Sequence, residues 1–314
     1  MIGGQVVALV LLSVVLMKAT DVVVKALHRL ASRMRVGTFG LAAVVAAMAT
    51  SLPELLVGIL AAVEGKSVLS LGNVVGSNIA NVSLIMGLAA VIGGSVGVVG
   101  EFLKRDFATA FLVGALPMLL LVDGDLSRVD GLGLLTVYGL YALGTFGKQR
   151  HYQARKIWQK LVNWETDKQV GWIVGGAAVM VVAADLLVQV AGDLAVSLKI
   201  PAFLMGLFVV AVGTSLPELV FEIEAIRKKE IGMVYGNLLG SVAANSTLVL
   251  GLTAMISPVN LNNGFKPYLL ATVAFVVVFG VFWLLVRTKK RLDRWEGAVL
   301  ILIYLVFAWI ELRR

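Results

Sequence analysis

Long apolar runs separated by short polar stretches dominate this chain from end to end. Each run lasts about 17 to 25 residues, the length that a helix needs to cross roughly 30 Å of hydrocarbon. The runs are continuous and do not alternate with polar residues, which predicts helices and not barrel strands. We expect ten spans, at residues 4–32, 37–63, 67–92, 106–122, 129–147, 171–198, 201–226, 233–256, 267–287 and 295–311.

Composition agrees with a membrane location for these helices. Hydrophobic residues make up 59% of the 314 residues and charged residues only 15%, which is more apolar surface than a soluble domain can bury. The sequence therefore predicts an all-α integral membrane protein in contact with the lipid bilayer. It holds no cysteine, and its two histidines lie beside basic residues, so neither a thiolate nor a histidine metal centre is expected.

Positive charge is distributed unevenly between the two sides that ten spans would create. The loops after the odd-numbered spans contain 19 lysines and arginines, whereas the other side, with the C-terminal pair, contains 6. By the positive-inside rule, both termini lie outside the cytoplasm. The net charge of +8 follows from this topology and does not indicate a nucleic-acid partner, and no protein partner is evident.

The longest polar stretch, 148–170, is then a cytosolic basic linker between two halves of five spans each, 1–147 and 171–314. Its aromatic and basic residues alternate. This pattern is compatible with nucleic-acid binding, but it is more typical of an interfacial helix anchored by tryptophans, which is what we expect here.

The two halves repeat one another at an offset of 164 residues. The motif regions lie at 37–92 and 201–256, and from residue 36 to 92 the alignment holds 22 identities in 57 positions without a gap. It pairs ATSLPEL with GTSLPEL. Because each half holds an odd number of spans, the second half enters the membrane from the opposite side. Such inverted repeats are typical of secondary transporters whose site lies near the midplane, where the repeats meet.

Each repeat places a proline directly before a glutamate in the middle of a span. Pro53 and Pro217 lack the N–H that would bond the carbonyl four residues earlier, which predicts a locally opened backbone. A structural kink would explain one such proline, but not a glutamate beside it twice. Ionised Glu54 and Glu218 cost several kcal/mol at this depth, and no basic residue of their own spans is placed to pair with them. A bound cation is the expected partner, since oxygen ligands suit Ca²⁺ and Na⁺.

The next span of each repeat carries polar residues at every fourth position. These residues are Asn73, Ser77 and Asn81, and then Asn237, Ser241 and Asn245. The spacing puts each set on one helix face, where it would either bond neighbouring helices or line a cation path, and its duplication beside the glutamates favours the path. The spacings Gly72-x-x-x-Gly76 and Gly236-x-x-x-Gly240 predict close approach of another helix.

Other acidic residues also lie inside the predicted spans, among them Asp21, which recurs as Asp185 in the second half, and Glu222 and Glu224. Asp21 lies four residues before Lys25, so we expect a surface ion pair and not a site residue. Glu222 and Glu224 have no counterpart in the first half. We expect Glu224 to pair with a basic residue one turn later. Our hypothesis for Glu222, one turn from Glu218, is that it lines a cytosolic vestibule.

The paired T-S-L-P-E motifs, each followed by G-N-x-x-G-S-x-x-x-N, resemble the two alpha repeats of the cation/calcium exchanger superfamily, most closely its prokaryotic sodium/calcium exchangers. The resemblance implies ten helices in two inverted five-helix repeats. It also implies an antiporter that exchanges Ca²⁺ for Na⁺ by alternating access, with no enzymatic activity and no cofactor. The metal ligands that it implies are Ala47, Thr50, Ser51, Glu54, Ser77, Asn81, Ala211, Thr214, Ser215, Glu218, Ser241 and Asn245.

The chain departs from the family pattern at two positions. Ala49 stands where the motif usually has glycine, which stiffens that turn. Asn245 stands where many relatives, including potassium-dependent ones, have an aspartate, so potassium co-transport is not expected.

Two other functions also use paired acidic residues inside a membrane. In a H⁺/Ca²⁺ exchanger the same two glutamates would release Ca²⁺ when protonated, and this alternative stays open. An intramembrane hydrolase with paired acids is disfavoured, because the chain has no His-Glu-x-x-His, no Gly-x-Gly-Asp and no histidine at membrane depth.

Overall fold

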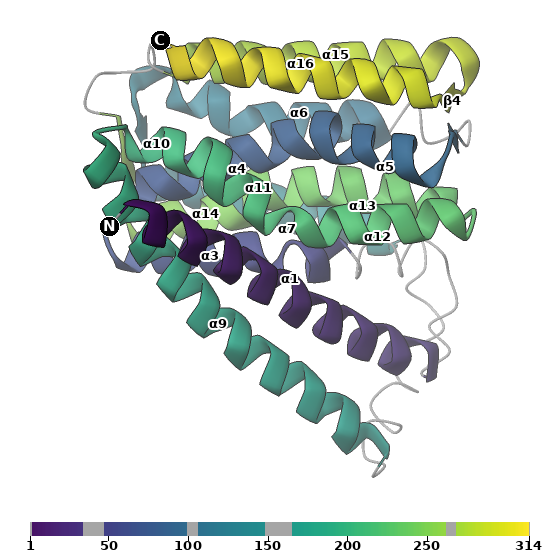
Figure 1. Cartoon of the computed structure of the whole chain (residues 1–314), viewed down its shortest axis with the longest axis horizontal. Helices are drawn as coiled ribbons and strands as arrows, with labels where there is room; N and C mark the ends of the chain where they lie inside the picture. The colour runs from purple at the N-terminus through teal and green to yellow at the C-terminus, as the bar shows by residue number, and fades with distance from the viewer. Residues whose placement is uncertain (1, 34–46, 99–105, 148–164, 262–267, 314) are drawn as a thin grey trace.

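The structure is a computed structural model that describes residues 2–33, 47–98, 106–147, 165–261 and 268–313 (Figure 1). The described part of the first half contains α1 (Ile2–Arg33), α3 (Leu52–Val63), α4 (Ser67–Ala80), the π-helix η1 (Asn81–Ile85), α5 (Met86–Gly93), α6 (Asp106–Leu120), the 3-10 turn η2 (Leu121–Asp123) and α7 (Arg128–Gly147). Residues 47–50 are helical as well.

The second half repeats this order of elements. It contains α9 (Glu165–Leu198), α10 (Ala202–Leu204), the π-helix η3 (Met205–Val210), α11 (Ala211–Thr214), α12 (Leu216–Arg227), α13 (Ile231–Ala243), the π-helix η4 (Ala244–Val249), α14 (Leu250–Ile256), α15 (Leu269–Lys289) and α16 (Arg294–Arg313). The π-helical segments were not predicted, because the apolar pattern does not distinguish them from an α-helix.

A helix occupies the described part of each of the ten predicted ranges. Within the described residues, six helices are long and apolar enough to cross a membrane, or up to seven if the broken pair Ala202–Thr214 and Leu216–Arg227 is one span. The chain is an all-helical membrane protein, and the count of ten spans stays a prediction. The described part of α9 includes residues 165–170 of the predicted linker 148–170, so this helix extends beyond the predicted range 171–198 at its N-terminal end. The rest of the linker, with its expected interfacial helix, lies outside the described residues.

Two pairs of two-residue strands, which the helical pattern did not predict, join the halves. β1 (Val96–Gly97) pairs antiparallel with β4 (Arg291–Leu292), and β2 (Asp125–Leu126) pairs antiparallel with β3 (Val259–Asn260). In the repeat alignment, β1 of the first half corresponds approximately to β3 of the second half, and β2 to β4. The two strand pairs are therefore formed by equivalent segments of the two halves.

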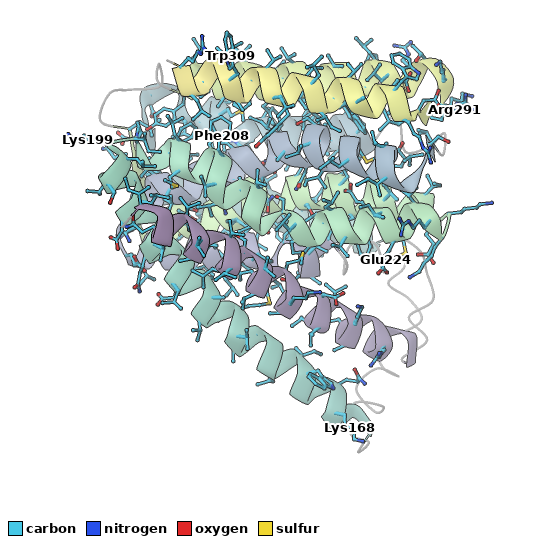
Figure 2. All side chains as sticks on the ribbon, viewed as in Figure 1. Lys168, Lys199, Phe208, Glu224, Arg291 and Trp309 are labelled. Atoms are coloured by element: carbon cyan, nitrogen blue, oxygen red, sulfur yellow. The ribbon has the colours of Figure 1, made fainter. Side chains whose placement is uncertain are left out.

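The helices form a bundle with α15 and α16 along one side and α1 and α9 along the opposite side (Figure 1). Both termini lie at one end of the bundle, and β4 lies at the other. Figure 2 labels Glu224 and Arg291 at the end with β4 and Lys199 at the end with the termini. The helices α1 and α9 diverge from the rest of the bundle, and they lie farthest from it at the C-terminal end of α1 and the N-terminal end of α9.

The interior is formed by α4 and α13, which are buried almost throughout. Glycines allow this packing: a Cβ at Gly72 or Gly76 would overlap the backbone carbonyl of Phe203 or Leu207. A Cβ at Gly240 would lie 2.7 Å from the Cβ of Ala47. The predicted close approach of other helices is thus confirmed at these three glycines.

Candidate cation-binding site

Both repeated motifs break a helix at a serine. Ser51 has φ −82° and ψ 6°, and Ser215 has φ −85° and ψ 4°, so the backbone departs from α-helical geometry between the preceding residues and α3 or α12. In the second motif the two helices meet at an angle of 40°. Pro53 and Pro217 lie in the first turn of the new helix, where a missing N–H costs little. The predicted opening of the backbone is confirmed, and its form, a break at the serine, comes from the structure.

The break puts each glutamate in the first turn of a helix, near its positive end. Glu54 and Glu218 are 0% and 1% exposed and lie within electrostatic range of one another. One oxygen of Glu54 lies 3.3 Å from the Oγ of Ser215 and 3.5 Å from the Oγ of Ser77. Among the described residues, its other oxygen and both oxygens of Glu218 make no hydrogen bond. The centre therefore holds two acidic groups with unused acceptor capacity.

Two equivalent hydrogen bonds cross between the halves beside these glutamates. The Oγ1 of Thr50 donates to the Oδ1 of Asn237 at 2.9 Å, and the Oγ1 of Thr214 lies 3.2 Å from the Oδ1 of Asn73. Each threonine hydroxyl also lies near a carbonyl three residues earlier in its own helix. The polar stripe therefore bonds helices together at these two asparagines, as one of our two interpretations of the stripe expected.

The carbonyls of the broken helices belong to the same network. The carbonyl of Ala47 accepts the N–H of Ser51 at 3.0 Å, and that of Ala211 accepts the N–H of Ser215 at 3.1 Å. The Oγ of Ser77 lies 3.5 Å from the carbonyl of Ala211. Each carbonyl oxygen has two lone pairs, so partial use by the protein leaves it able to face a cation.

The remaining predicted ligands are buried with free acceptor atoms. In the described part of the chain, the hydroxyls of Ser51 and Ser241 and both amide atoms of Asn81 have no hydrogen-bond partner. The Oδ1 of Asn245 has none either, whereas its Nδ2 donates to Asn78 at 3.3 Å. Asn81 begins η1 and Asn245 lies in η4, and π-helical turns are frequent at functional sites.

All twelve predicted ligands are buried, and they contribute carboxylate, hydroxyl, amide and carbonyl oxygens. This donor set fits a hard cation such as Ca²⁺ or Na⁺. Among the described residues, no three Asp, Glu, His or Cys side chains gather at metal-binding range. A cation at this centre would therefore depend on neutral oxygens as well as on the two glutamates.

Sequence reasoning left four buried polar residues out of the predicted site. Asn73 and Asn237 were seen in the stripe, but only the structure pairs them with the threonines. Asn78 and Ser246 form a bond of 2.7 Å beside Asn245. No signal marked them, since the equivalent positions in the other half are Val242 and Val82.

A cavity of about 390 Å³ lies between α1, α12 and the beginning of α13, and Thr50 is one of the residues that line it. Asp21 pairs with Lys25 at 2.7 Å and Glu224 with Lys228 at 3.3 Å, and all four residues line the cavity. Both ion pairs were predicted. The cavity is thus lined both by Thr50 of the candidate site and by Glu224, which Figure 2 labels toward the end with β4.

Glu222 does not line this cavity, so the structure gives no support to the vestibule hypothesis. Residues such as Pro217 and Phe221 form the face of α12 that lines the cavity, and Glu222 lies about a third of a turn away from that face. It is 0% exposed, and both its oxygens lack a hydrogen bond of ordinary geometry within the described residues. Its neighbours on α13 are the side chains of Asn237 and Tyr235.

Comparison with known proteins gives consistent relatives. The family model described as sodium/calcium exchanger protein matches residues 4–147 and 168–313. The chain is 35% identical to the inner membrane protein YrbG of Escherichia coli over 68% of both chains. It is 29% identical to the putative antiporter CaxA of Alkalimonas amylolytica over 95% of both, and 28% identical to the sodium/calcium exchanger MaX1 of Methanosarcina acetivorans over 94% of both.

The fold is also similar to solved structures of the sodium-calcium exchanger NCX_Mj. The structure soaked with Na⁺ and Sr²⁺ has a TM-score of 0.68 and 27% identity over 96% of this chain and 97% of that chain. The structure soaked with Na⁺ and no Ca²⁺ has a TM-score of 0.68 and 26% identity over 98% of both chains.

Proposed function

Because the chain belongs to the sodium/calcium exchanger family, we propose that it is a secondary active antiporter that exchanges Ca²⁺ for Na⁺ across the membrane. The observation that carries the proposal is the pair of buried glutamates, Glu54 and Glu218, at equivalent positions of the two halves and with unused acceptor oxygens. Both ions are substrates, and the proposal involves no cofactor.

The proposed ion ligands are the residues implied by the family resemblance. They are Ala47, Thr50, Ser51, Glu54, Ser77, Asn81, Ala211, Thr214, Ser215, Glu218, Ser241 and Asn245. Burial of all twelve and the hydrogen bonds that cross between the halves support this assignment.

Exchange follows from the charge of this site. One Ca²⁺ or several Na⁺ balance two carboxylates, but both loads together exceed their charge. An empty, doubly charged site would have to cross the membrane interior without compensation, which is costly. The loaded states therefore interconvert, and the two ions compete for the same oxygens.

Alternating access requires that the site opens to one side at a time. We propose that the cavity between α1 and α12 is the cytosolic entrance in this conformation. The basic helix ends near this entrance are expected on the cytosolic side, with both termini on the opposite side. The diverging pair of α1 and α9 is the element that would move.

We further propose ten spans in two inverted five-helix repeats, 1–147 and 171–314, joined by a cytosolic linker. The equivalent strand pairs and the equivalent threonine–asparagine bonds support this arrangement. Both are contacts that a two-fold relation between the halves would generate.

Transport by purified protein in liposomes tests the function. We expect ⁴⁵Ca²⁺ uptake driven by an outward Na⁺ gradient, with the proton gradient collapsed by an ionophore. Glu54→Gln and Glu218→Gln should abolish this uptake, while Glu64→Gln, in a partly buried ion pair with Lys66 outside the proposed site, should retain it. Uptake that requires a proton gradient and ignores Na⁺ would instead establish H⁺/Ca²⁺ exchange.

A further inference from the structure

Asn78 is a buried amide beside the proposed site and not one of its ligands. It lies on α4, is 1% exposed, and the equivalent residue of the second half is Val242. Its polar group therefore belongs to only one half of the repeat. Its contacts determine which atom of Asn245 is left to face an ion.

The orientation of Asn78 is determined by a carbonyl on α6. The Oγ of Ser246 donates its one hydrogen to the carbonyl of Gly114 at 3.3 Å, because a carbonyl cannot donate. Ser246 must then accept its bond of 2.7 Å from the Nδ2 of Asn78. The Oδ1 of Asn78 is left to accept from the Nδ2 of Asn245 at 3.3 Å.

This chain of bonds prevents the Asn245 amide from turning over. A turned amide would set its Oδ1 against the Oδ1 of Asn78, and two acceptors without a hydrogen between them repel one another. The Oδ1 of Asn245 is buried and makes no hydrogen bond within the described residues. Asn81, its equivalent in the first half, has no such restraint, since neither of its amide atoms is bonded there.

We infer that Asn78 is a positioning residue that keeps the amide oxygen of Asn245, and not its NH₂ group, available to the transported cation. The inference rests on the proposed function, because it assigns a role to one of the proposed ligands. An NH₂ group directed at a cation would repel it, so loss of the restraint should weaken ion binding.

The test measures ⁴⁵Ca²⁺ binding to purified protein and its competition by Na⁺. Asn78→Val, which copies the residue of the second half, should weaken Ca²⁺ binding about tenfold. The control is Ser83→Ala, which removes a buried hydroxyl whose partner within the described residues is the carbonyl of Ile79, four residues earlier, and it should bind as wild type does. If Asn78→Val does not fold, Ser246→Ala frees the Asn78 amide to rotate and should weaken binding in the same direction.

A cycle with Asn245→Ala separates positioning from packing. If Asn78 acts through Asn245, adding Asn78→Val to Asn245→Ala should cause no further loss of affinity. Equal losses in both backgrounds, or unchanged binding in both Asn78→Val and Ser246→Ala, would overturn the inference. Wild-type protein without Na⁺-driven Ca²⁺ uptake would refute the proposed function instead, so the two failures are distinguishable.

Discussion

The hydroxyl of Thr50 donates a hydrogen bond of 2.9 Å to Asn237, which lies 187 residues away in the other half of the chain. Thr214 makes the equivalent contact with Asn73 at 3.2 Å. Each threonine is the last helical residue before the break at the serine, and it lies four residues before a glutamate of the proposed site. The two bonds therefore connect the glutamate-bearing motif of each half to the polar stripe of the other half.

Removal of the Thr50 hydroxyl should affect both stability and ion binding. Thr50→Val leaves Asn237 with a buried, unbonded acceptor, at a cost of about 1–3 kcal/mol. We expect a lower thermal midpoint in detergent and about tenfold weaker ⁴⁵Ca²⁺ binding. Thr50→Ser keeps the hydroxyl and should restore both. Equal behaviour of the valine and serine variants would mean that the bond to Asn237 contributes nothing.

Glu222 should contribute little to cation binding, because it is not a proposed ligand and the proposed charge balance involves two carboxylates. It is 0% exposed, and both its oxygens lack a hydrogen bond of ordinary geometry within the described residues, so an ionised carboxylate at this position would be uncompensated. Glu222→Gln should therefore change Ca²⁺ binding no more than the matched control Glu224→Gln, in an exposed ion pair. A loss of Ca²⁺ affinity of about tenfold or more in Glu222→Gln alone would show instead that Glu222 is ionised and adds a third charge one turn from Glu218.

Gly213 allows α1 to pack against the broken helix. A Cβ at this position would overlap the Oγ of Ser13 and lie 3.1 Å from its Cβ. Gly213→Ala should lower the free energy of unfolding by about 1–3 kcal/mol. Adding Ser13→Ala to this variant removes the overlapping oxygen and should restore most of the lost stability. Gly175→Ala serves as the control, because a Cβ there meets nothing within 4 Å. Chemical denaturation in detergent measures all four proteins.

The proposed orientation can be tested by cysteine labelling, because the chain has no cysteine of its own. Ser197 and Thr288 are exposed residues near the ends of α9 and α15, which we assign to opposite sides of the membrane. A membrane-impermeant maleimide should label Ser197→Cys in intact cells and Thr288→Cys only after permeabilisation. The reverse pattern would place the termini in the cytoplasm.

Much of the fold was predictable because it depends on local properties of the chain. The length of an apolar run determines whether a helix can cross the membrane, and the structure has helices within a few residues of the predicted ranges. A proline removes a specific hydrogen bond, so the open backbone before Glu54 and Glu218 could also be foreseen. The Gly213 contact now gives a reason for the difference between the motifs, since Ala49 stands at the position equivalent to Gly213 and Ala177 at the position equivalent to Ser13.

The contacts between the halves were not predictable in the same way. A period of four residues shows that Asn73, Ser77 and Asn81 share a face, but not which helix faces them. The structure pairs Asn73 with Thr214, and it brings Ser77 to Glu54 and Ala211. Partners of this kind depend on how helices more than a hundred residues apart pack together.

The sequence by itself determined the helical membrane class, the repeat and the two glutamates, because each follows from residue types and their spacing along one chain. Only the tertiary structure decided which hydroxyls and amides surround those glutamates, that the cavity reaches Thr50, and that Asn78 restrains Asn245. The physical reason is that a buried polar atom must find its partner in space, and in this protein many of those partners belong to the other half of the chain.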